Sequence, residues 1–299
     1  MKHTQIYLLR ALTNLHPGAG DANFGIIDKH VQRDSVTDLP TIFASSIKGS
    51  LRELFESGNA NSANVLTIFG GGADGKAQVE ALAGEHNDEA GAEQPNPTGK
   101  PTAARQPAQG NYIFYEAKLI ALPIRSDRDL YYLATTPPLV QEMLDDCELH
   151  GVTPEGMEGL RQIAEMGRSV RKGEPKYFGE DRGKVQLEEH QGHQASSALE
   201  DETALESIFG KRLAVLHVDD FQRLAKELPT VARNSLNNGI SVNLWYEEIV
   251  PRETRFYCPV TAMVEEQDLL EAGLASHNHL VQIGGNATVG QGLCKWIKL

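Results

Sequence analysis

The loop from His16 to Asp34 gathers side chains that could do acid–base or metal chemistry. It reads HPGAGDANFGIIDKHVQRD and places the carboxylate of Asp28 close to histidines and cations. Its glycines let the backbone bend tightly and approach a ligand. A carboxylate can hold a divalent metal or accept a proton, and a histidine can move protons near neutral pH. The composition therefore indicates a catalytic loop.

A structural interpretation fits the same loop. Polar surface loops use Asp and Asn side chains to cap turns, and no spacing here singles out a set of metal ligands. The residues alone leave both interpretations open.

The segment 45–56 has the spacing of an amphipathic helix. Its apolar residues fall at positions i, i+4, i+7 and i+8, namely Ile47, Leu51, Leu54 and Phe55. We expect a helix that is capped by Ser45 or Ser46 and ends near Gly58.

Two cations on this expected helix could bind a phosphate. Lys48 lies in the first turn, where unpaired backbone N–H groups favour an anion, and Arg52 lies one turn later on the same stripe. The alternative is a solvated helix face on which Arg52 pairs with Glu56. Both interpretations stay open at this point.

A glycine-rich segment near the C-terminus, IGGNATVGQG over residues 283–292, forms the third candidate. Four of its residues are glycines, namely Gly284, Gly285, Gly290 and Gly292. Such a loop between two strands can lie flat against a phosphodiester backbone. It is neither a dinucleotide-binding fingerprint nor a P-loop, because the spacing differs and Gly-Lys-Ser/Thr is missing. A glycine-rich hairpin required only for steric reasons is the alternative.

A fold of alternating strands and helices must position these segments. Strands are expected at 5–12, 112–124, 212–218, 254–265, 280–283 and 293–299. Further helices are expected at 137–149, 154–167, 219–228 and 266–276. The triplet Asn237-Asn238-Gly239 predicts the turn of a long hairpin over about 230–253. Strand–helix–strand units near both ends indicate an α+β sandwich of the split βαβ type.

Two insertions interrupt this pattern. The first covers about 58–111, and from about residue 70 its composition turns to Gly, Ala, Pro, Gln, Asn and Glu. The second covers about 137–207 and is polar and acidic after residue 170. Such compositions predict surface segments. We therefore expect a single elaborated domain over residues 1–299.

The net charge of −13 argues against a free-standing nucleic-acid binder, because phosphate neutralisation needs clustered Lys and Arg. The charge is uneven, however. Residues 1–60 carry six Lys or Arg and six acids, so the acidic excess lies downstream. A local nucleic-acid surface is compatible with this balance if binding is shared with partners.

Cysteine usage and hydropathy favour a cytoplasmic protein. The three cysteines are far apart and lack metal-ligand spacing, so neither a disulfide framework nor a zinc site is expected. No stretch approaches the roughly 20 apolar residues of a membrane span. The apolar run at the N-terminus is interrupted by Arg10 and lacks a cleavage site, so a strand is the better interpretation.

Three segments together resemble a known family. The runs LLRALTNLHPGAGDANFGIIDKHVQRD and LPTIFASSIKGSLRELFE are similar to the N-terminal signature of the fourth-subunit family of the Cmr complex. These are the repeated backbone proteins of type III-B CRISPR effectors, within the RAMP superfamily. IGGNATVGQG resembles the glycine-rich loop of RAMP proteins, and the hairpin with LWYEEIVP resembles the family's thumb. The likeness is close over about 5–56 and fair over 230–299.

The resemblance implies an RRM-like (ferredoxin-like) palm that bears a β-hairpin thumb. Copies would stack along a guide CRISPR RNA with other Cmr subunits, and a complementary single-stranded target RNA would be cut at regular intervals. It also implies that Ser45, Ser46, Lys48, Arg52 and the glycines at 284, 285, 290 and 292 bind the guide RNA.

The resemblance further implies a metal-dependent endoribonuclease that uses the ribose 2′-OH, with Mg²⁺ or Mn²⁺ as cofactor. The aspartate of the family's Gly-x-x-Asp is Asp28 here, as catalytic and metal-binding residue. His16, and Glu247 or Glu248 of the thumb, match residues near the same site. A non-catalytic guide-RNA scaffold is the alternative. A guide-processing nuclease would call for a histidine dyad that the sequence does not offer.

Overall fold

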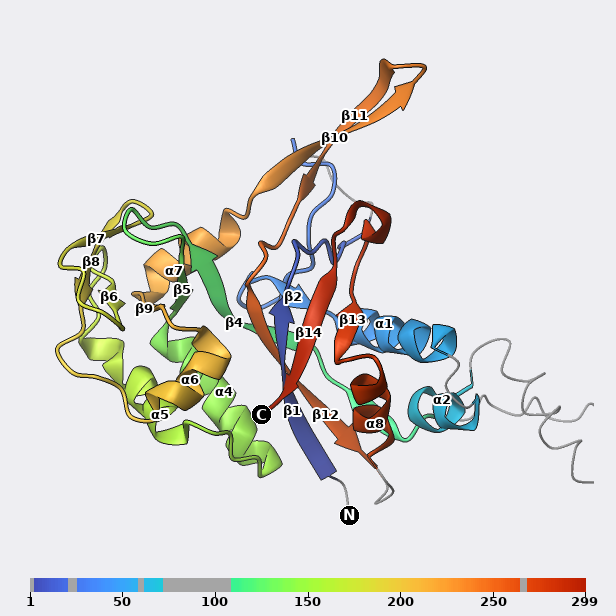
Figure 1. Cartoon of the computed structure of the whole chain (residues 1–299), viewed down its shortest axis with the longest axis horizontal. Helices are drawn as coiled ribbons and strands as arrows, with labels where there is room; N and C mark the ends of the chain where they lie inside the picture. Colours follow the sequence, from blue (N-terminus) through green and yellow to red (C-terminus); the bar gives the residue numbers. More distant parts are fainter. Residues whose placement is uncertain (1–2, 21–25, 59–61, 72–108, 264–267) are drawn as a thin grey trace, which may run out of the picture.

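The computed structural model describes residues 3–20, 26–58, 62–71, 109–263 and 268–299. The segment 70–111, expected as a surface insertion, lies almost wholly outside the described residues. The described ranges form a palm, a lobe beside it and a projecting hairpin (Figure 1).

The palm is an antiparallel sheet built around β1 (His3–Ala11). β1 pairs with β12 (Arg255–Ala262) on one edge and with β14 (Leu293–Lys298) on the other, and β12 continues to β4 (Ala117–Ile124). The apolar run from Ile6 to Leu9 is fully buried because both faces of this strand are covered. The order β14-β1-β12-β4, with one helix after β1 and another after β12, is the ferredoxin-like arrangement that was predicted.

The predicted strand 112–124 is in fact two strands. β3 (Tyr112–Phe114) pairs with the end of β12, and β4 pairs with its beginning. The break lies beside Pro259, which has no N–H to donate to the ladder. Two short strands complete the palm, β2 (Thr41–Ile42) on β4 and β13 (Leu280–Gln282) on β14.

Three helices gather beside the palm (Figure 1), namely α1 (Ala44–Ser57), α2 (Ser62–Phe69) and α8 (Leu269–Ser276). α1 buries the predicted apolar stripe, and a side chain at Gly273 of α8 would overlap the Phe55 ring, so these helices pack closely.

The predicted cap of α1 by Ser45 or Ser46 is wrong. Phe43 is the N-cap, and no side chain caps it. Gln32, which is distant from α1 in the sequence, bonds to the start of the helix. Its Oε1 accepts the Phe43 N–H at 2.7 Å, and its Nε2 donates to Ser46 Oγ at 2.9 Å. The predicted end near Gly58 is confirmed, since Gly58 is the C-cap.

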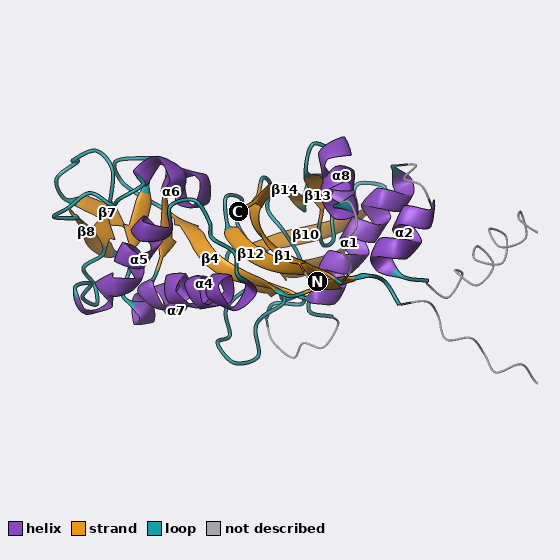
Figure 2. Cartoon of the chain, turned by 90° about the horizontal axis from the view of Figure 1, so that it is seen from below, coloured by secondary structure: helices purple, strands orange, loops and turns teal. Residues whose placement is uncertain are grey.

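The lobe continues the same sheet in the order β4-β5-β9-β6-β8-β7. Its strands are β5 (Tyr132–Thr135), β6 (Lys176–Tyr177), β7 (Val185–Leu187), β8 (His190–Gln194) and β9 (Leu213–Val215). Its helices are α4 (Pro137–His150), α5 (Met157–Glu165), α6 (Glu202–Phe209) and α7 (Val218–Lys226). Figure 2 shows the strands as a layer with α6 and α8 on one side and α4 and α7 on the other. The polar segment after residue 170 thus contributes strands, which its composition did not indicate.

The predicted hairpin is confirmed as the thumb, formed by β10 (Thr230–Asn237) and β11 (Ile240–Glu248). Asn238 and Gly239 both have positive φ, 51° and 80°, as a type I′ turn requires. The thumb projects from the body (Figure 1) and exposes five large apolar side chains, namely Leu236, Ile240, Val242, Leu244 and Tyr246. A surface of this kind marks a binding site.

The three cysteines, Cys147, Cys258 and Cys294, are buried and free. Over the described ranges, the structure contains no helix with the length and apolarity that crossing a membrane requires.

Candidate functional site

The loop from His16 to Asp34 folds back on itself. Gly18 and Val31 form an antiparallel bridge, and the backbone N–H of Gln32 donates to Pro17 O at 2.8 Å. Residues 21–25, which include the glycine of the Gly-x-x-Asp motif, lie outside the described residues. The arm that returns from the loop, residues 28–33, runs along the base of the thumb.

Asp28 is exposed and attached to the thumb. Its backbone N–H donates to Tyr246 O at 3.0 Å, and its Oδ2 accepts the Tyr246 N–H at 2.7 Å. One carboxylate oxygen is therefore held at the junction of loop and hairpin, and the residue as a whole is exposed. Such a group can bind a cation or accept a proton from a ligand that lies there.

Glu248 is a buried anchor for the loop. Its Oε2 accepts the Val31 N–H at 3.0 Å and lies 3.2 Å from His30 Nδ1, and its Oε1 bonds to the Arg33 guanidinium. The residue is only 2% exposed. Because protein donors surround this carboxylate, its observed role is to tie the loop to the thumb.

Glu247 is a second buried carboxylate, with four donors around it. Its Oε1 accepts from Trp245 Nε1 at 2.7 Å and Lys29 Nζ at 3.3 Å. Its Oε2 accepts from Arg233 Nε at 3.1 Å and Asn286 Nδ2 at 2.8 Å. Burial alone would raise the pKa of Glu247, but hydrogen bonds from Trp245, Asn286 and Lys29 outweigh it and lower that pKa to about 2.

His16 is buried beside these groups. Its Nδ1 lies 2.8 Å from Glu248 O. Because a carbonyl only accepts, Nδ1 carries the proton, and Nε2 is then an acceptor in the neutral ring. Gly18 lies beside Nε2, where a Cβ would approach to 3.4 Å.

The glycine-rich loop packs on the same segment, between β13 and β14 as predicted. Gly285 N–H donates to His16 O at 3.0 Å, and a Cβ on Gly284 would lie 2.5 Å from that oxygen. Gly292 N–H donates to Asn14 O at 2.9 Å. Close packing thus explains Gly284, whereas Gly290 has φ +77° and no heavy atom within 4 Å of its would-be Cβ.

Of the residues on α1 that were predicted to bind RNA, some already bond to protein groups and others could still bind a phosphate. Arg52 donates to Glu56 Oε1 at 2.7 Å and to Gly70 O at 3.1 Å, as the structural alternative expected. Ser45 is exposed, and Lys48 makes no ion pair within the described part of the chain. Lys48 is therefore the cation on this helix that a phosphate could reach most readily.

The structure thus brings Asp28, His16, Glu247, Glu248 and the glycine-rich loop to the thumb base, and Gln32 joins the start of α1 to them. Among the described residues, no three His, Cys, Asp or Glu side chains form a metal site by themselves. Mg²⁺ is commonly held by one or two carboxylates with phosphate oxygens and water. The exposed carboxylate of Asp28 fits that pattern when RNA supplies the other oxygens.

Several contributors to this site escaped the sequence analysis, among them Gln32, Arg233 and Asn286. The hairpin register could have indicated one of them. Arg233 lies opposite Trp245, and Glu247 follows two residues later on the same face. Gln32 and Asn286 act through contacts between distant segments, for which the sequence carries no local signal.

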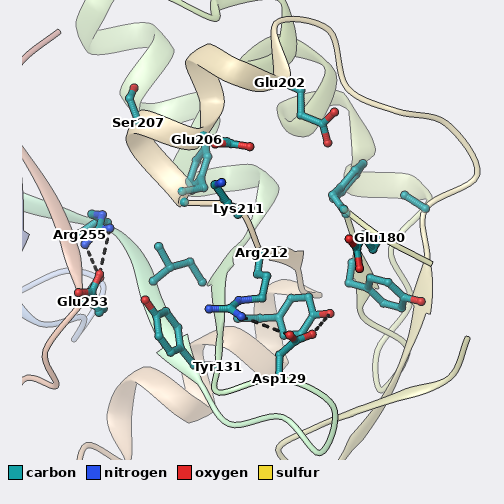
Figure 3. Close-up of a pocket in the computed structure, with 18 of the residues that line it drawn as sticks. Asp129, Tyr131, Glu180, Glu202, Glu206, Ser207, Lys211, Arg212, Glu253 and Arg255 are labelled. Carbon is teal, nitrogen blue, oxygen red and sulfur yellow. Dashed lines mark hydrogen bonds and ion pairs between the residues drawn. The ribbon is translucent and has the colours of Figure 1, made fainter. Parts of the chain in front are cut away.

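A cavity of about 1000 Å³ opens elsewhere, between the palm and the lobe (Figure 3). Four of its cations are paired with carboxylates that also line it, in the pairs Arg10–Glu253, Arg255–Glu253, Arg212–Asp129 and Arg182–Glu180. Because these charges compensate one another, the cavity does not present the unpaired basic surface that RNA binding needs.

Comparisons with known proteins identify relatives of the chain. The model of the RAMP superfamily matches residues 8–295. The CRISPR system Cmr endoribonuclease Cmr4 of Pyrococcus furiosus is 30% identical over 313 residues, which cover 96% of this chain and 92% of that protein.

Two solved structures show the same fold. A type III-B Cmr-β complex bound to cognate target RNA contains a chain with TM-score 0.69 and 22% identity, covering 99% of this chain and 96% of that one. Oligomeric Cmr4 from Pyrococcus furiosus gives TM-score 0.63 and 22% identity, covering 100% and 98%. The predicted fold class is thereby confirmed.

Proposed function

The chain belongs to the RAMP superfamily, and from this premise we propose that it is a backbone subunit of an RNA-guided CRISPR effector complex. It works in the cytoplasm, binds guide RNA together with further copies of itself and other Cmr subunits, and cuts the complementary target RNA. The observation that carries the cleavage role is the exposed Asp28 carboxylate, fixed by Tyr246 at the thumb base.

The guide RNA would follow the start of α1 and the glycine-rich loop. The prediction that Lys48 lies in the first helical turn is wrong, because α1 begins at Ala44 and Lys48 therefore lies in its second turn. Lys48 would bind a phosphate of the guide backbone through its ammonium group. Ser45 and Gly290 are accessible along the same path. The apolar thumb would pack against bases, and guide pairing would supply the sequence specificity, as in other guided effectors.

Cleavage would proceed by attack of the ribose 2′-oxygen on the neighbouring phosphorus. The 2′-O–P bond forms and the P–O5′ bond breaks, which leaves a cyclic phosphate and a 5′-hydroxyl; the 2′-OH gives up its proton and the leaving 5′-oxygen gains one. Mg²⁺ or Mn²⁺, when bound at Asp28, would neutralise charge on the phosphate. Asp28 would hold the reacting groups in place, and His16 Nε2, an acceptor in the neutral ring, would be the candidate to take the proton.

A guide-RNA scaffold without catalytic activity is the second candidate. The lack of a self-contained set of metal ligands among the described residues favours it. The two candidates differ in whether bound target RNA is cut.

Reconstitution of the complex with guide and labelled target distinguishes them. We expect fragments at regular spacing that require a matching guide and Mg²⁺ or Mn²⁺. A complex that contains all subunits and binds the matched target but leaves it intact would establish the scaffold instead.

Lys48→Glu is expected to weaken guide binding about tenfold or more at low salt and to shorten the assemblies seen on a native gel. The substitution puts a carboxylate where a phosphate would lie, and loss of one phosphate contact lowers the salt slope by about one. Lys184→Glu makes the same charge change at an exposed lobe position and should bind like the wild type. Unchanged assembly of Lys48→Glu would show that α1 does not touch RNA.

A further inference from the structure

Five residues meet at the base of the thumb and form what we call the thumb-base cluster: Lys29, Arg233, Trp245, Glu247 and Asn286. They come from four segments of the chain, which are the loop that carries Asp28, the two thumb strands and the glycine-rich loop. Glu247 is the member that all the others contact. Its carboxylate therefore joins the thumb to the palm.

The environment of Glu247 makes this joint specific. The residue is 1% exposed, and each of its two carboxylate oxygens accepts from two donors. Lys29 Nζ also lies 5.5 Å from the centre of the Trp245 ring, which adds a cation–π contact to the ion pair. Hydrogen bonds to ionised groups are short and directional, so they fix relative positions better than neutral contacts do.

Asp28 is attached directly to this joint. Its neighbour Lys29 forms a parallel bridge with Glu247, while Asp28 exchanges hydrogen bonds with Tyr246 in both directions. The returning arm of the loop thus lies alongside the end of β11. A change in the angle of the thumb would carry the Asp28 carboxylate with it.

We infer that Glu247 is a positioning residue: its carboxylate sets the thumb against the palm and thereby places Asp28 on the target RNA backbone, without exchanging a proton with the substrate. This inference rests on the proposed cleavage function and deepens it. Glu247 was expected to take part in catalysis; we now expect it to act indirectly, by positioning Asp28.

Two further observations support this role. The lowered pKa, about 2, keeps Glu247 ionised at neutral pH, where a proton carrier would have to change state. In addition, Arg233 Nη2 is buried and has no hydrogen-bond partner among the residues that the structure describes. An unsatisfied buried donor reduces stability, so the cluster is not optimised for stability alone.

Glu247→Gln in the reconstituted complex tests the inference. The glutamine amide keeps the shape of the Glu247 side chain, but its NH₂ group would face donors where one carboxylate oxygen now accepts. The contact between thumb and palm should therefore loosen. We expect guide and target binding within about twofold of wild type and cleavage slower by about 10-fold to 100-fold, because small displacements of reacting groups have effects of that size. Cuts should spread to neighbouring phosphodiester bonds, and the shape of the pH–rate profile should stay unchanged. Glu148→Gln, at an exposed position on α4, is the matched control and should cleave like wild type.

Asn286→Ala provides a second route if Glu247→Gln fails to assemble. It removes one donor from the glycine-rich loop and leaves the carboxylate, so it should give a milder form of the same spreading. Where both variants assemble, their combination should be less than additive, because both loosen one joint.

Three outcomes would overturn the inference: wild-type cleavage by Glu247→Gln, loss of one limb of its pH–rate profile, or, if it does not assemble, wild-type cuts by Asn286→Ala. A lost limb would identify Glu247 as a proton carrier and would leave the proposed function intact. Failure of the proposed function is seen separately, as a wild-type complex that binds target and never cuts it.

Discussion

Asp28→Asn should slow target cleavage by about a thousandfold or more while the target stays bound. The asparagine Oδ can still accept the Tyr246 N–H, so the loop keeps its place on the thumb. What is lost is the negative charge that would hold a cation or take a proton, and loss of such a group typically costs 10²–10⁴-fold. Single-turnover cleavage of end-labelled target, with a native gel to follow binding, measures both effects.

Asp38→Asn is the matched control for this change. Asp38 is an exposed acid in the same region, paired with Lys226, and its φ of +59° suits asparagine equally well. It should cleave like the wild type. A target with a single 2′-deoxyribose at the scissile position should resist the wild-type complex, because the nucleophile is missing. Wild-type rates from Asp28→Asn would remove the catalytic assignment and leave a carrier of guide RNA.

Gly284→Ala is expected to lower the free energy of unfolding by about 3 kcal/mol. Its φ of +81° costs an alanine about 1–2 kcal/mol. The new methyl group would also lie 2.5 Å from His16 O, a backbone atom that cannot move alone, and such overpacking typically costs about 1–3 kcal/mol. Thermal unfolding of the isolated chain should show a loss of several degrees in Tm.

Gly290→Ala separates these two costs. This glycine has nearly the same φ, +77°, in the same loop, but nothing lies within 4 Å of its would-be Cβ. It should therefore lose only the conformational part, about 1–2 kcal/mol. Equal losses in the two variants would mean that the glycine-rich loop does not press against His16 in solution.

The palm and the thumb were predictable because their signals are local. β1 contains a continuous apolar run, and α1 has an apolar stripe with helical spacing. Asn238-Gly239 predicts the turn of the thumb because Asn and Gly readily adopt the positive φ angles of a type I′ turn. Three strands of the lobe, β6, β7 and β8, were missed because they are two to five residues long and lie in a polar segment. Their burial depends on a few residues such as Tyr177 and Val185, and β6 is held in the sheet by pairing with the distant strand β9.

The sequence predicted which segments of the chain form the candidate site, but not what each side chain does there. Glu247 and Glu248 are adjacent acids at the end of a strand, so their side chains point to opposite faces. One meets Arg233 and Asn286, and the other meets Val31 and Arg33. Burial of both acids requires cations from distant segments, which no local pattern shows. The sequence therefore indicated where the acids lie along the chain but not that both are buried.

The single hydrogen-bonded sheet that runs from β13 to β7 has a mechanical consequence. Palm and lobe share strands rather than a linker, so no flexible hinge separates them, and the subunit should move as one stiff block. If many such blocks stack along a strand of RNA, the pitch and bending of the stack must be accommodated at the contacts between neighbours. The flexibility of the assembly would then be set by the contacts between neighbouring subunits and not by motion within each subunit.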